Sequence, residues 1–98
     1  YYAILFEYYK ELLTDKQIET FICYYNEDYS LAEIAEEFNI SRNAVWDTLK
    51  KVVSLLEYYE EKLRLYDKDQ KLNQYLDDLK KHVDAEGLKI IDNIEEME

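Results

Sequence analysis

The stretch SLAEIAEEFNISRNAVWDTLKK, residues 30–51, decides the fold of this chain. Asn39 lies near its middle, and asparagine tolerates the left-handed backbone conformation that a tight turn requires. Ala35 is small enough to stand where two steeply crossing helices touch. Apolar anchors precede and follow the turn at Ile34, Phe38, Ile40, Val45 and Leu49. The spacing therefore predicts a helix-turn-helix unit.

The rest of the chain also favours helix. It contains no proline and one glycine, Gly87, so we expect an all-α fold with turns built from Asn, Asp and Ser. Residues 14–17 and 30–33 have the form of capping boxes, in which the first and last side chains each bond a free backbone N–H. Ser41 and Asp84 are expected to cap the helices that follow them. Gly87 is expected to weaken the last helix by about 1 kcal/mol relative to alanine.

The apolar stripes divide the chain into two parts. We expect a three- or four-helix head with a long fourth helix over residues 1–66, and a helical extension over residues 67–98. A break is predicted within residues 67–71, because the apolar stripe of the fourth helix ends there. This stripe comprises Val45, Leu49, Val52, Leu56, Tyr59, Leu63 and Tyr66. The expected face of the first helix comprises Tyr1, Ile4, Leu5, Tyr8, Tyr9 and Leu12.

The charge is strongly acidic, with a formal net charge of −11 at pH 7. Residues 72–98 carry eight acidic residues against three lysines, a net charge of −5. Residues 28–51 carry five acidic residues against three basic ones, a net charge of −2. Proteins that bind nucleic acid usually present a basic face. We therefore expect any binding by a monomer to be weak and sensitive to salt.

Four segments resemble a known family. They are residues 6–17 (FEYYKELLTDKQ), 24–25 (YY), 28–47 (DYSLAEIAEEFNISRNAVWD) and 55–63 (LLEYYEEKL). The head resembles region 4 of bacterial sigma factors and, more closely, the YlxM-like family of small helix-turn-helix DNA-binding proteins. Genes of that family lie beside those for signal recognition particle components. The resemblance covers about the first two-thirds of the chain and weakens after residue 70.

The resemblance has implications for both fold and function. It implies a helical, winged-helix-superfamily-like fold, to which the apolar stripes add the expectation of long C-terminal helices. It implies no enzymatic activity, and a regulatory or accessory role in the signal recognition particle pathway. DNA is the expected ligand, with RNA as an alternative.

The candidate nucleic-acid site lies at the start of the fourth helix, because these positions of a helix-turn-helix face the major groove. Arg42 would bind guanine or a phosphate, Asn43 would read adenine, and Ser41 would donate to a phosphate. Two lysines would hold further phosphates. An aspartate among these residues would repel the phosphate backbone of the nucleic acid, unless it accepts a hydrogen bond from a cytosine amine. The predicted site comprises Ser41, Arg42, Asn43, Trp46, Asp47, Lys50 and Lys51.

Alternatives remain open at several of these positions. The site residues would be ordinary solvated side chains if the helix-turn-helix serves as a scaffold for an adaptor that docks a basic protein. Trp46 either packs on the first helices or contacts a base or a partner. In each of the pairs 24–25 and 58–59, we expect one tyrosine in the core and the other on a surface suited to a partner.

The long helices also offer a partner surface. We expect a homodimer that doubles the number of nucleic-acid contacts. The residues assigned to this surface are Leu56, Tyr59, Leu63, Tyr66, Leu72, Tyr75, Leu76 and Leu79.

Other chemistry is not indicated. Cys23 is the only cysteine and is expected to be a packed thiol, which fits a reducing, cytoplasmic setting. His82 has no partners at metal-ligand spacing. The sequence indicates no cofactor, no metal site, no catalytic constellation and no apolar run long enough for a membrane span. Because the chain begins with Tyr1 rather than methionine, we expect that the natural start lies upstream.

Overall fold

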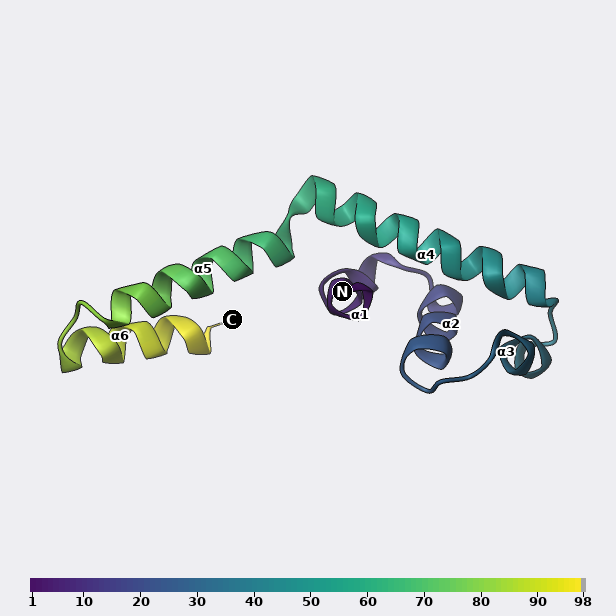
Figure 1. The fold of residues 1–98 in the computed structure, drawn as a ribbon, viewed down its shortest axis with the longest axis horizontal. Helices are drawn as coiled ribbons and strands as arrows, with labels where there is room; N and C mark the ends of the chain where they lie inside the picture. Colours follow the sequence, from purple (N-terminus) through teal and green to yellow (C-terminus); the bar gives the residue numbers. More distant parts are fainter. Residues whose placement is uncertain (98) are drawn as a thin grey trace. The chain divides into compact units, whose positions relative to one another are not determined.

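A computed structural model describes residues 1–97 of the chain, and every regular element in that range is a helix (Figure 1). In chain order these are α1 (Tyr2–Tyr9), the short 3-10 helix η1 (Lys10–Leu12), α2 (Asp15–Tyr25), α3 (Leu31–Phe38), α4 (Arg42–Leu63), α5 (Leu65–Lys80) and α6 (Ala85–Glu96). The near absence of helix breakers explains this content. The prediction of an all-α fold is confirmed.

The structure divides into two compact units, which we call the head, residues 1–66, and the tail, residues 67–98. In the head, α4 packs against α1, α2 and α3 (Figure 1). The stripe predicted for α4 supplies the centre of this packing with Val45, Leu49, Val52 and Leu56, which are all buried. One end of the stripe packs with α1 and α2, and the other end packs with α3.

The predicted face of the first helix is partly wrong. Ile4 and Leu12 are exposed, whereas Phe6 and Leu13 are buried. The cause is tertiary, because the ring of Phe6 stacks on that of Phe21 with centroids 4.3 Å apart, which turns α1 toward α2. The change from α-helix to 3-10 helix at Lys10 then shifts the phase of the residues that follow.

The break between α4 and α5 lies at Arg64, three residues before the predicted range. Arg64 ends α4 in the left-handed conformation, with φ of 55°. The first N–H groups of α5 find partners in the head: Leu65 N donates to the Tyr9 hydroxyl at 3.0 Å, and Tyr66 N donates to Glu60 Oε1 at 3.1 Å. These long-range contacts fix the end of α4, and local periodicity does not reveal them.

The predicted caps are confirmed. In the first box the Thr14 hydroxyl accepts from Gln17 N at 3.2 Å, and the Gln17 side chain accepts from Thr14 N at 2.9 Å. In the second, Ser30 and Glu33 exchange equivalent bonds of 3.1 Å. These bonds satisfy N–H groups that have no partner within the helix, which matters most for the eight-residue α3.

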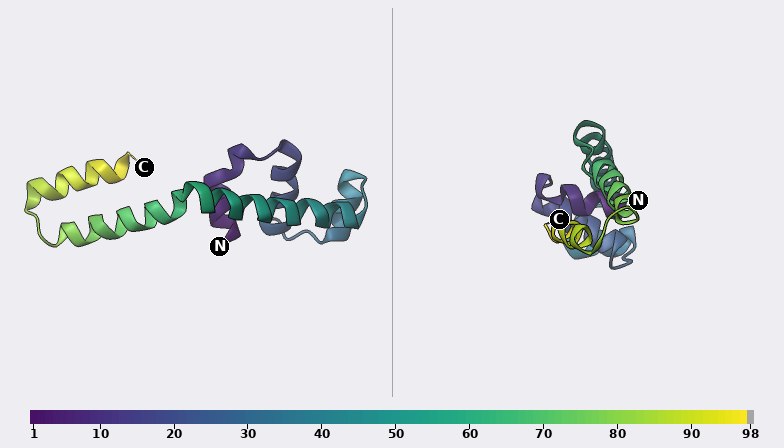
Figure 2. Two further views of the ribbon diagram at one scale, coloured as in Figure 1. Left: turned by 90° about the horizontal axis from the view of Figure 1, so that it is seen from above. Right: turned by 90° about the vertical axis from the view of Figure 1, so that its left-hand side faces the viewer.

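The tail is a hairpin in which α6 lies beside the part of α5 that belongs to the tail (Figures 1 and 2). The Asp84 carboxylate caps α6 by accepting from Gly87 N at 2.9 Å, as predicted. Lys80 Nζ joins the two helices through an ion pair with Glu95 Oε1 at 2.6 Å. Within residues 1–97, no helix has both the length and the apolar character that a bilayer crossing requires.

Candidate nucleic-acid interface

The turn between α3 and α4 sets the geometry of the candidate site. Asn39 ends α3 in the left-handed conformation, with φ 55° and ψ 47°, as the sequence predicts. Ile40 N then donates to Ala35 O at 3.0 Å, which closes the turn. Ala35 is 7% exposed in the core between α3 and α4. This helix-turn-helix geometry leaves the start of α4 at the surface.

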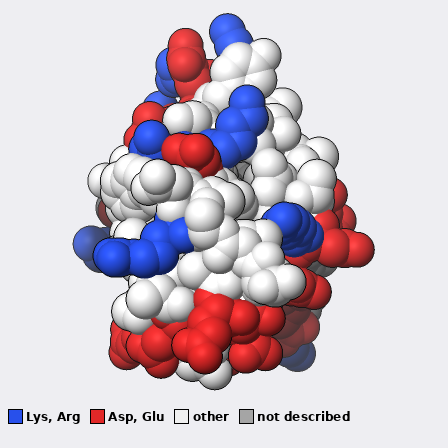
Figure 3. All heavy atoms as spheres, turned by 90° about the vertical axis from the view of Figure 1, so that its right-hand side faces the viewer, with Lys and Arg blue, Asp and Glu red and all other residues white. Residues whose placement is uncertain are grey.

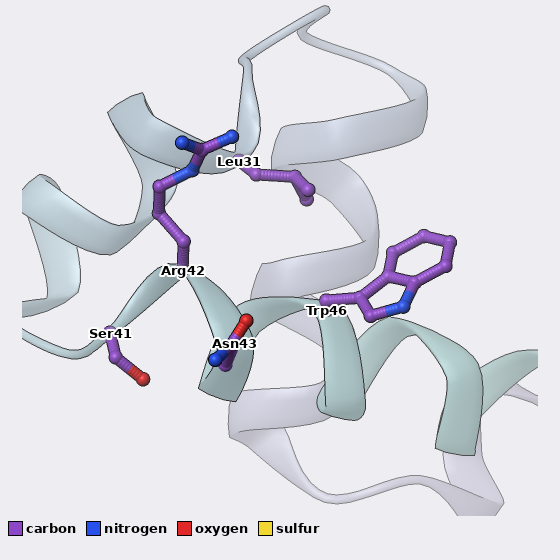
Figure 4. Close-up of a pocket in the computed structure, with 5 residues that line it drawn as sticks. All are labelled: Leu31, Ser41, Arg42, Asn43 and Trp46. Carbon is purple, nitrogen blue, oxygen red and sulfur yellow. The ribbon is translucent and has the colours of Figure 1, made fainter.

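Four of the seven predicted site residues line one open pocket of about 620 Å³ at the start of α4: Ser41, Arg42, Asn43 and Trp46. Leu31 of α3 completes the lining and was not anticipated from the sequence. Figure 4 shows the Arg42 guanidinium and the Trp46 indole on opposite sides of Leu31. We call this pocket the N-terminal pocket.

The groups in the N-terminal pocket are suited to an anion and to base edges. Ser41 Oγ accepts from Ala44 N at 3.0 Å as the cap of α4, which leaves its hydroxyl hydrogen for an acceptor on a ligand. Arg42 and Asn43 are exposed in the first turn of α4. The start of a helix carries a partial positive charge that favours phosphate and other anions.

Lys50 and Asp47 form a pair on the surface of α4. Lys50 Nζ lies 3.4 Å from Asp47 Oδ1 and 5.8 Å from the centroid of the Trp46 ring system. The two charged side chains are 56% and 73% exposed, and an ion pair in such a position is weak. A phosphate that approaches Lys50 therefore competes with a weak internal partner.

Lys51 lies apart from this group. One residue advances the helix by about 100°, so Lys51 projects from a different side of α4 than Lys50. Neither Lys51 nor Asp47 lines the N-terminal pocket or the neighbouring groove described next. Five of the seven predicted residues therefore line these two hollows, Asp47 adjoins them through its pair with Lys50, and Lys51 lies apart.

A second hollow begins at the other side of Trp46 and has a volume of about 430 Å³. Trp46 lines both hollows. We call the second one the aromatic groove, and its lining residues are Tyr2, Tyr24, Tyr25, Trp46, Leu49, Lys50, Val53 and Ser54.

The tyrosine pair at residues 24–25 was the feature of the sequence that indicated a binding surface in the region of the aromatic groove. As predicted, the pair divides: Tyr24 packs against the core between α3 and α4, whereas Tyr25 is 39% exposed. Tyr2 was missed because its approach to Trp46 depends on the packing of α1 against α4, whereas Val53 and Ser54 follow Trp46 by about two turns of the same helix, a spacing that could have revealed them.

Acidic side chains are concentrated on one edge of the end of the head that carries α3 and the start of α4. In the space-filling view they gather along the lower edge, whereas basic, uncharged and some further acidic side chains lie above them (Figure 3). The acidic group on α3 includes Glu33, Glu36 and Glu37, which line a hollow together with Tyr29. Among the described residues that line the N-terminal pocket and the aromatic groove, Arg42 and Lys50 are basic and none is acidic.

The predicted partner surface is wrong at two residues. Leu56 is fully buried in the core of the head, and Leu76 is 6% exposed in the tail. Tyr59 and Tyr66 are partly buried against the core of the head. The remaining four residues of that prediction, Leu63, Leu72, Tyr75 and Leu79, are exposed.

Cys23 belongs to the packing of the head. It is partly buried against the core between α3 and α4, as expected for a packed thiol. Burial raises the pKa of the Cys23 thiol, with a further contribution from nearby carboxylates. The thiolate that nucleophilic chemistry requires is therefore disfavoured.

Comparison with known proteins agrees with this architecture. A UPF0122 protein of Lactococcus lactis subsp. cremoris (strain MG1363) is 57% identical over 77 residues, which cover 79% of this chain and 69% of the relative. A UPF0122 protein of Thermoanaerobacter sp. (strain X514) is 47% identical over 100 residues, covering 94% of this chain and 86% of the relative. The sequence model of the UPF0122 family, described as "Putative helix-turn-helix protein, YlxM / p13 like", matches residues 1–97. The chain therefore belongs to the UPF0122 family of YlxM/p13-like helix-turn-helix proteins.

Proposed function

We propose that this protein is a non-enzymatic regulatory or accessory protein that binds nucleic acid, DNA in the first place, through the start of α4. The observation that carries the proposal is the N-terminal pocket. There a helix-turn-helix places Arg42 and Asn43 at the exposed first turn of its second helix. Residues in this position contact base edges in helix-turn-helix complexes.

Each side chain has a role that follows from its chemistry. Arg42 donates two bonds to guanine or holds a phosphate, and Asn43 pairs with adenine. The Ser41 hydroxyl and the two lysines at positions 50 and 51 bind phosphates, which position the protein without reading sequence. With so few cations the affinity of one head is low and falls steeply with salt.

We place this activity in the cytoplasm and in the signal recognition particle pathway. The support is the resemblance of residues 6–63 to a family whose genes accompany those of particle components. Components of that particle are accordingly proposed partners, and RNA is the alternative ligand.

A homodimer formed through the tail would supply the missing affinity. Among the described tail residues, Leu76 and Ile91 are the buried hydrophobic ones, which is a small core for a two-helix unit. Seven large apolar side chains of the tail remain exposed: Leu72, Tyr75, Leu79, Leu88, Ile90, Ile94 and Met97. Pairing of two tails would cover them and bring two copies of α4 onto one ligand.

Sedimentation equilibrium at micromolar concentration tests the dimer. We expect Leu79→Asp to convert the dimer to monomer, because it places a charge among the exposed apolar residues of the tail. The matched control is Leu12→Asp, which alters an exposed leucine of the head. A monomeric parent protein would remove this part of the proposal.

A salt titration of DNA binding tests the proposed function. The anisotropy of a labelled duplex is measured between about 50 and 200 mM salt for the parent chain, Arg42→Ala and Lys50→Ala. Each variant should lower the slope of log affinity against log salt by about 1. Lys62→Ala, which alters an exposed lysine near the other end of α4, is the control and should leave the slope unchanged. No binding to DNA or RNA at about 50 mM salt would contradict the proposal.

The acidic edge of α3 favours a second candidate function, an adaptor that docks a basic protein. Glu33, Glu36 and Glu37 lie together there, and α3 provides no basic residue to offset them. Capture of a basic partner that is lost in the variant Glu36→Gln/Glu37→Gln, together with no binding of nucleic acid, would support this alternative.

A further inference from the structure

We propose that the aromatic groove receives an unpaired base of the nucleic acid held by α4, so that the preferred target is single-stranded or looped rather than fully paired. This inference rests on the proposed function, because it assigns a target structure to the same surface. It begins from Trp46, which is 46% exposed and lines both hollows.

The position of Trp46 between two cations supports a strand that runs along α4. Arg42, Trp46 and Lys50 follow one another at steps of four residues, so they lie along one side of the helix. At 1.5 Å per residue the Cα atoms of the two basic residues are separated by about 12 Å along the axis. A backbone lying along this side would meet a cation before and after the indole, an arrangement typical of single-strand binders.

The wall of the aromatic groove is already a stack of rings. Phe6 and Phe21 stack with centroids 4.3 Å apart and planes 11° apart, and Phe21 stacks on Tyr25 at 4.4 Å and 22°. The stack begins in the buried core and ends at Tyr25, which lines the groove. Tyr24 braces Tyr25 edge-on at 5.1 Å. Rings held in this way lose little freedom when a base packs against them.

A paired duplex offers nothing that this groove can stack on. In B-form DNA the faces of the bases are covered by their neighbours, and the major groove presents only base edges. Unpaired bases in loops and single strands expose their faces and stack on aromatic side chains. Stacking also requires no net positive charge, which suits a chain with a net charge of −11.

The charges around the groove favour a nucleotide over a basic peptide. Among the described lining residues of the aromatic groove, Lys50 is the charged one and none is a carboxylate. Two neighbouring carboxylates, Asp47 and Glu57, are already engaged by Lys50 and by the Tyr2 hydroxyl. That same lysine lies over the indole, with its Nζ 5.8 Å from the ring centroid. A phosphate would draw Lys50 away from the indole and from its exposed pair with Asp47.

Trp46 is the only tryptophan, so its fluorescence reports on the groove directly. Emission, excited beyond the absorption of tyrosine, is titrated at low salt with a short single-stranded DNA and its RNA equivalent. A hairpin with an unpaired loop and a fully paired duplex of the same sequence are titrated in the same way. Free N-acetyltryptophanamide corrects for absorption by the oligonucleotides. We expect quenching by the two single strands and the hairpin, and little or none by the duplex. Comparison of the titrations with single-stranded DNA and RNA shows which of the two nucleic acids is preferred.

Variants measured by the anisotropy of labelled oligonucleotides test the role of the ring. Trp46→Leu should weaken binding of the single strand roughly 5- to 150-fold, the range for losing one base–aromatic stack. Its loss of affinity for duplex should be smaller than its loss of affinity for the single strand, and Trp46→Phe should retain most of the affinity for the single strand. Tyr58→Leu is the matched control, because Tyr58 is an exposed aromatic residue of α4 with Lys62 Nζ 5.8 Å from its ring but lies outside the groove.

The outcomes separate this inference from the proposed function. Binding of duplex that depends on Arg42, with no quenching by single strands and no effect of Trp46→Leu, would overturn the inference and leave the proposed function standing. The absence of binding to any oligonucleotide would remove both. Quenching by an arginine-rich peptide but by no oligonucleotide would assign the groove to a protein partner and also overturn the inference.

Discussion

Tyr9 places a hydroxyl group inside the head at the point where α4 ends and α5 begins. The side chain is 1% exposed, and its hydroxyl donates to Glu60 Oε1 at 2.5 Å while it accepts from Leu65 N at 3.0 Å. One buried side chain thus links α1 to two consecutive helices. Neither bond follows from the sequence, since the partners are more than fifty residues away.

Removing this hydroxyl should be costly. Tyr9→Phe leaves the ring in the core but deprives Leu65 N and Glu60 of a partner, which we expect to cost about 1–3 kcal/mol. Urea denaturation followed by circular dichroism measures the loss. Tyr58→Phe, at a residue that is 52% exposed, is the control and should change stability by less than about 0.5 kcal/mol. Equal stability of the two variants would show that the Tyr9 bonds contribute nothing.

The same residue gives the head a dependence on alkaline pH. Burial, together with the bond to Glu60, raises the pKa of Tyr9 to about 12. The unfolded chain releases this proton near pH 10, whereas the folded chain retains it. The stabilisation is therefore complete below about pH 10 and is lost as pH rises toward 12, amounting to about 2 kcal/mol.

Denaturation at a series of pH values checks this dependence. The Tyr9→Phe variant should lose less stability between pH 10 and 12 than the parent chain. A smaller slope should remain in the variant, because the hydrogen bond to Glu57 also raises the pKa of Tyr2. Parallel curves for the parent chain and the variant would contradict the role assigned to Tyr9.

At the scale of the element, helix ends and helix faces were predictable to different degrees. The caps at Thr14, Ser30, Ser41 and Asp84 are all present, because a cap depends on residues only a few positions apart. The face of α1 was predicted less well, because packing against both α2 and α4 selects it. The stripe of α4 was predicted well from Val45 to Leu56, since three helices contact that face, whereas Leu63 near its end is exposed.

Gly87 shows how packing reverses a local expectation. Its position in α6 predicts that alanine would stabilise the helix, yet a Cβ there would lie 2.6 Å from Val83 Cβ. Gly87→Ala should therefore destabilise α6, despite a gain of about 1 kcal/mol in helix propensity. Hydrogen exchange of the α6 amides measures the effect. Asn93→Ala, at an exposed position of the same helix, is the control and should increase protection.

At the scale of the whole molecule, the net charge of −11 acts on folding and on binding with opposite signs. Added salt screens repulsion among the carboxylates, which stabilises the fold. The same salt weakens contacts with phosphate. Between about 50 and 200 mM salt, we expect the midpoint temperature of unfolding to rise while the affinity for nucleic acid falls. Each kcal/mol of added stability should raise that temperature by about 4–8 °C. Thermal denaturation and anisotropy on the same samples measure both, and a falling midpoint would contradict the repulsion.

The sequence by itself determined the helical content, the capping boxes, the left-handed turn at Asn39 and the identity of the residues at the start of α4. Each of these depends on residues within about one or two helical turns of each other, so periodicity and side-chain chemistry suffice. The tertiary structure decided which face of α1 is buried, where α4 ends, and that Tyr2, Tyr25 and Trp46 line one groove. Those outcomes require contacts between residues far apart in the chain, and burial in a shared core selects them over locally equivalent alternatives.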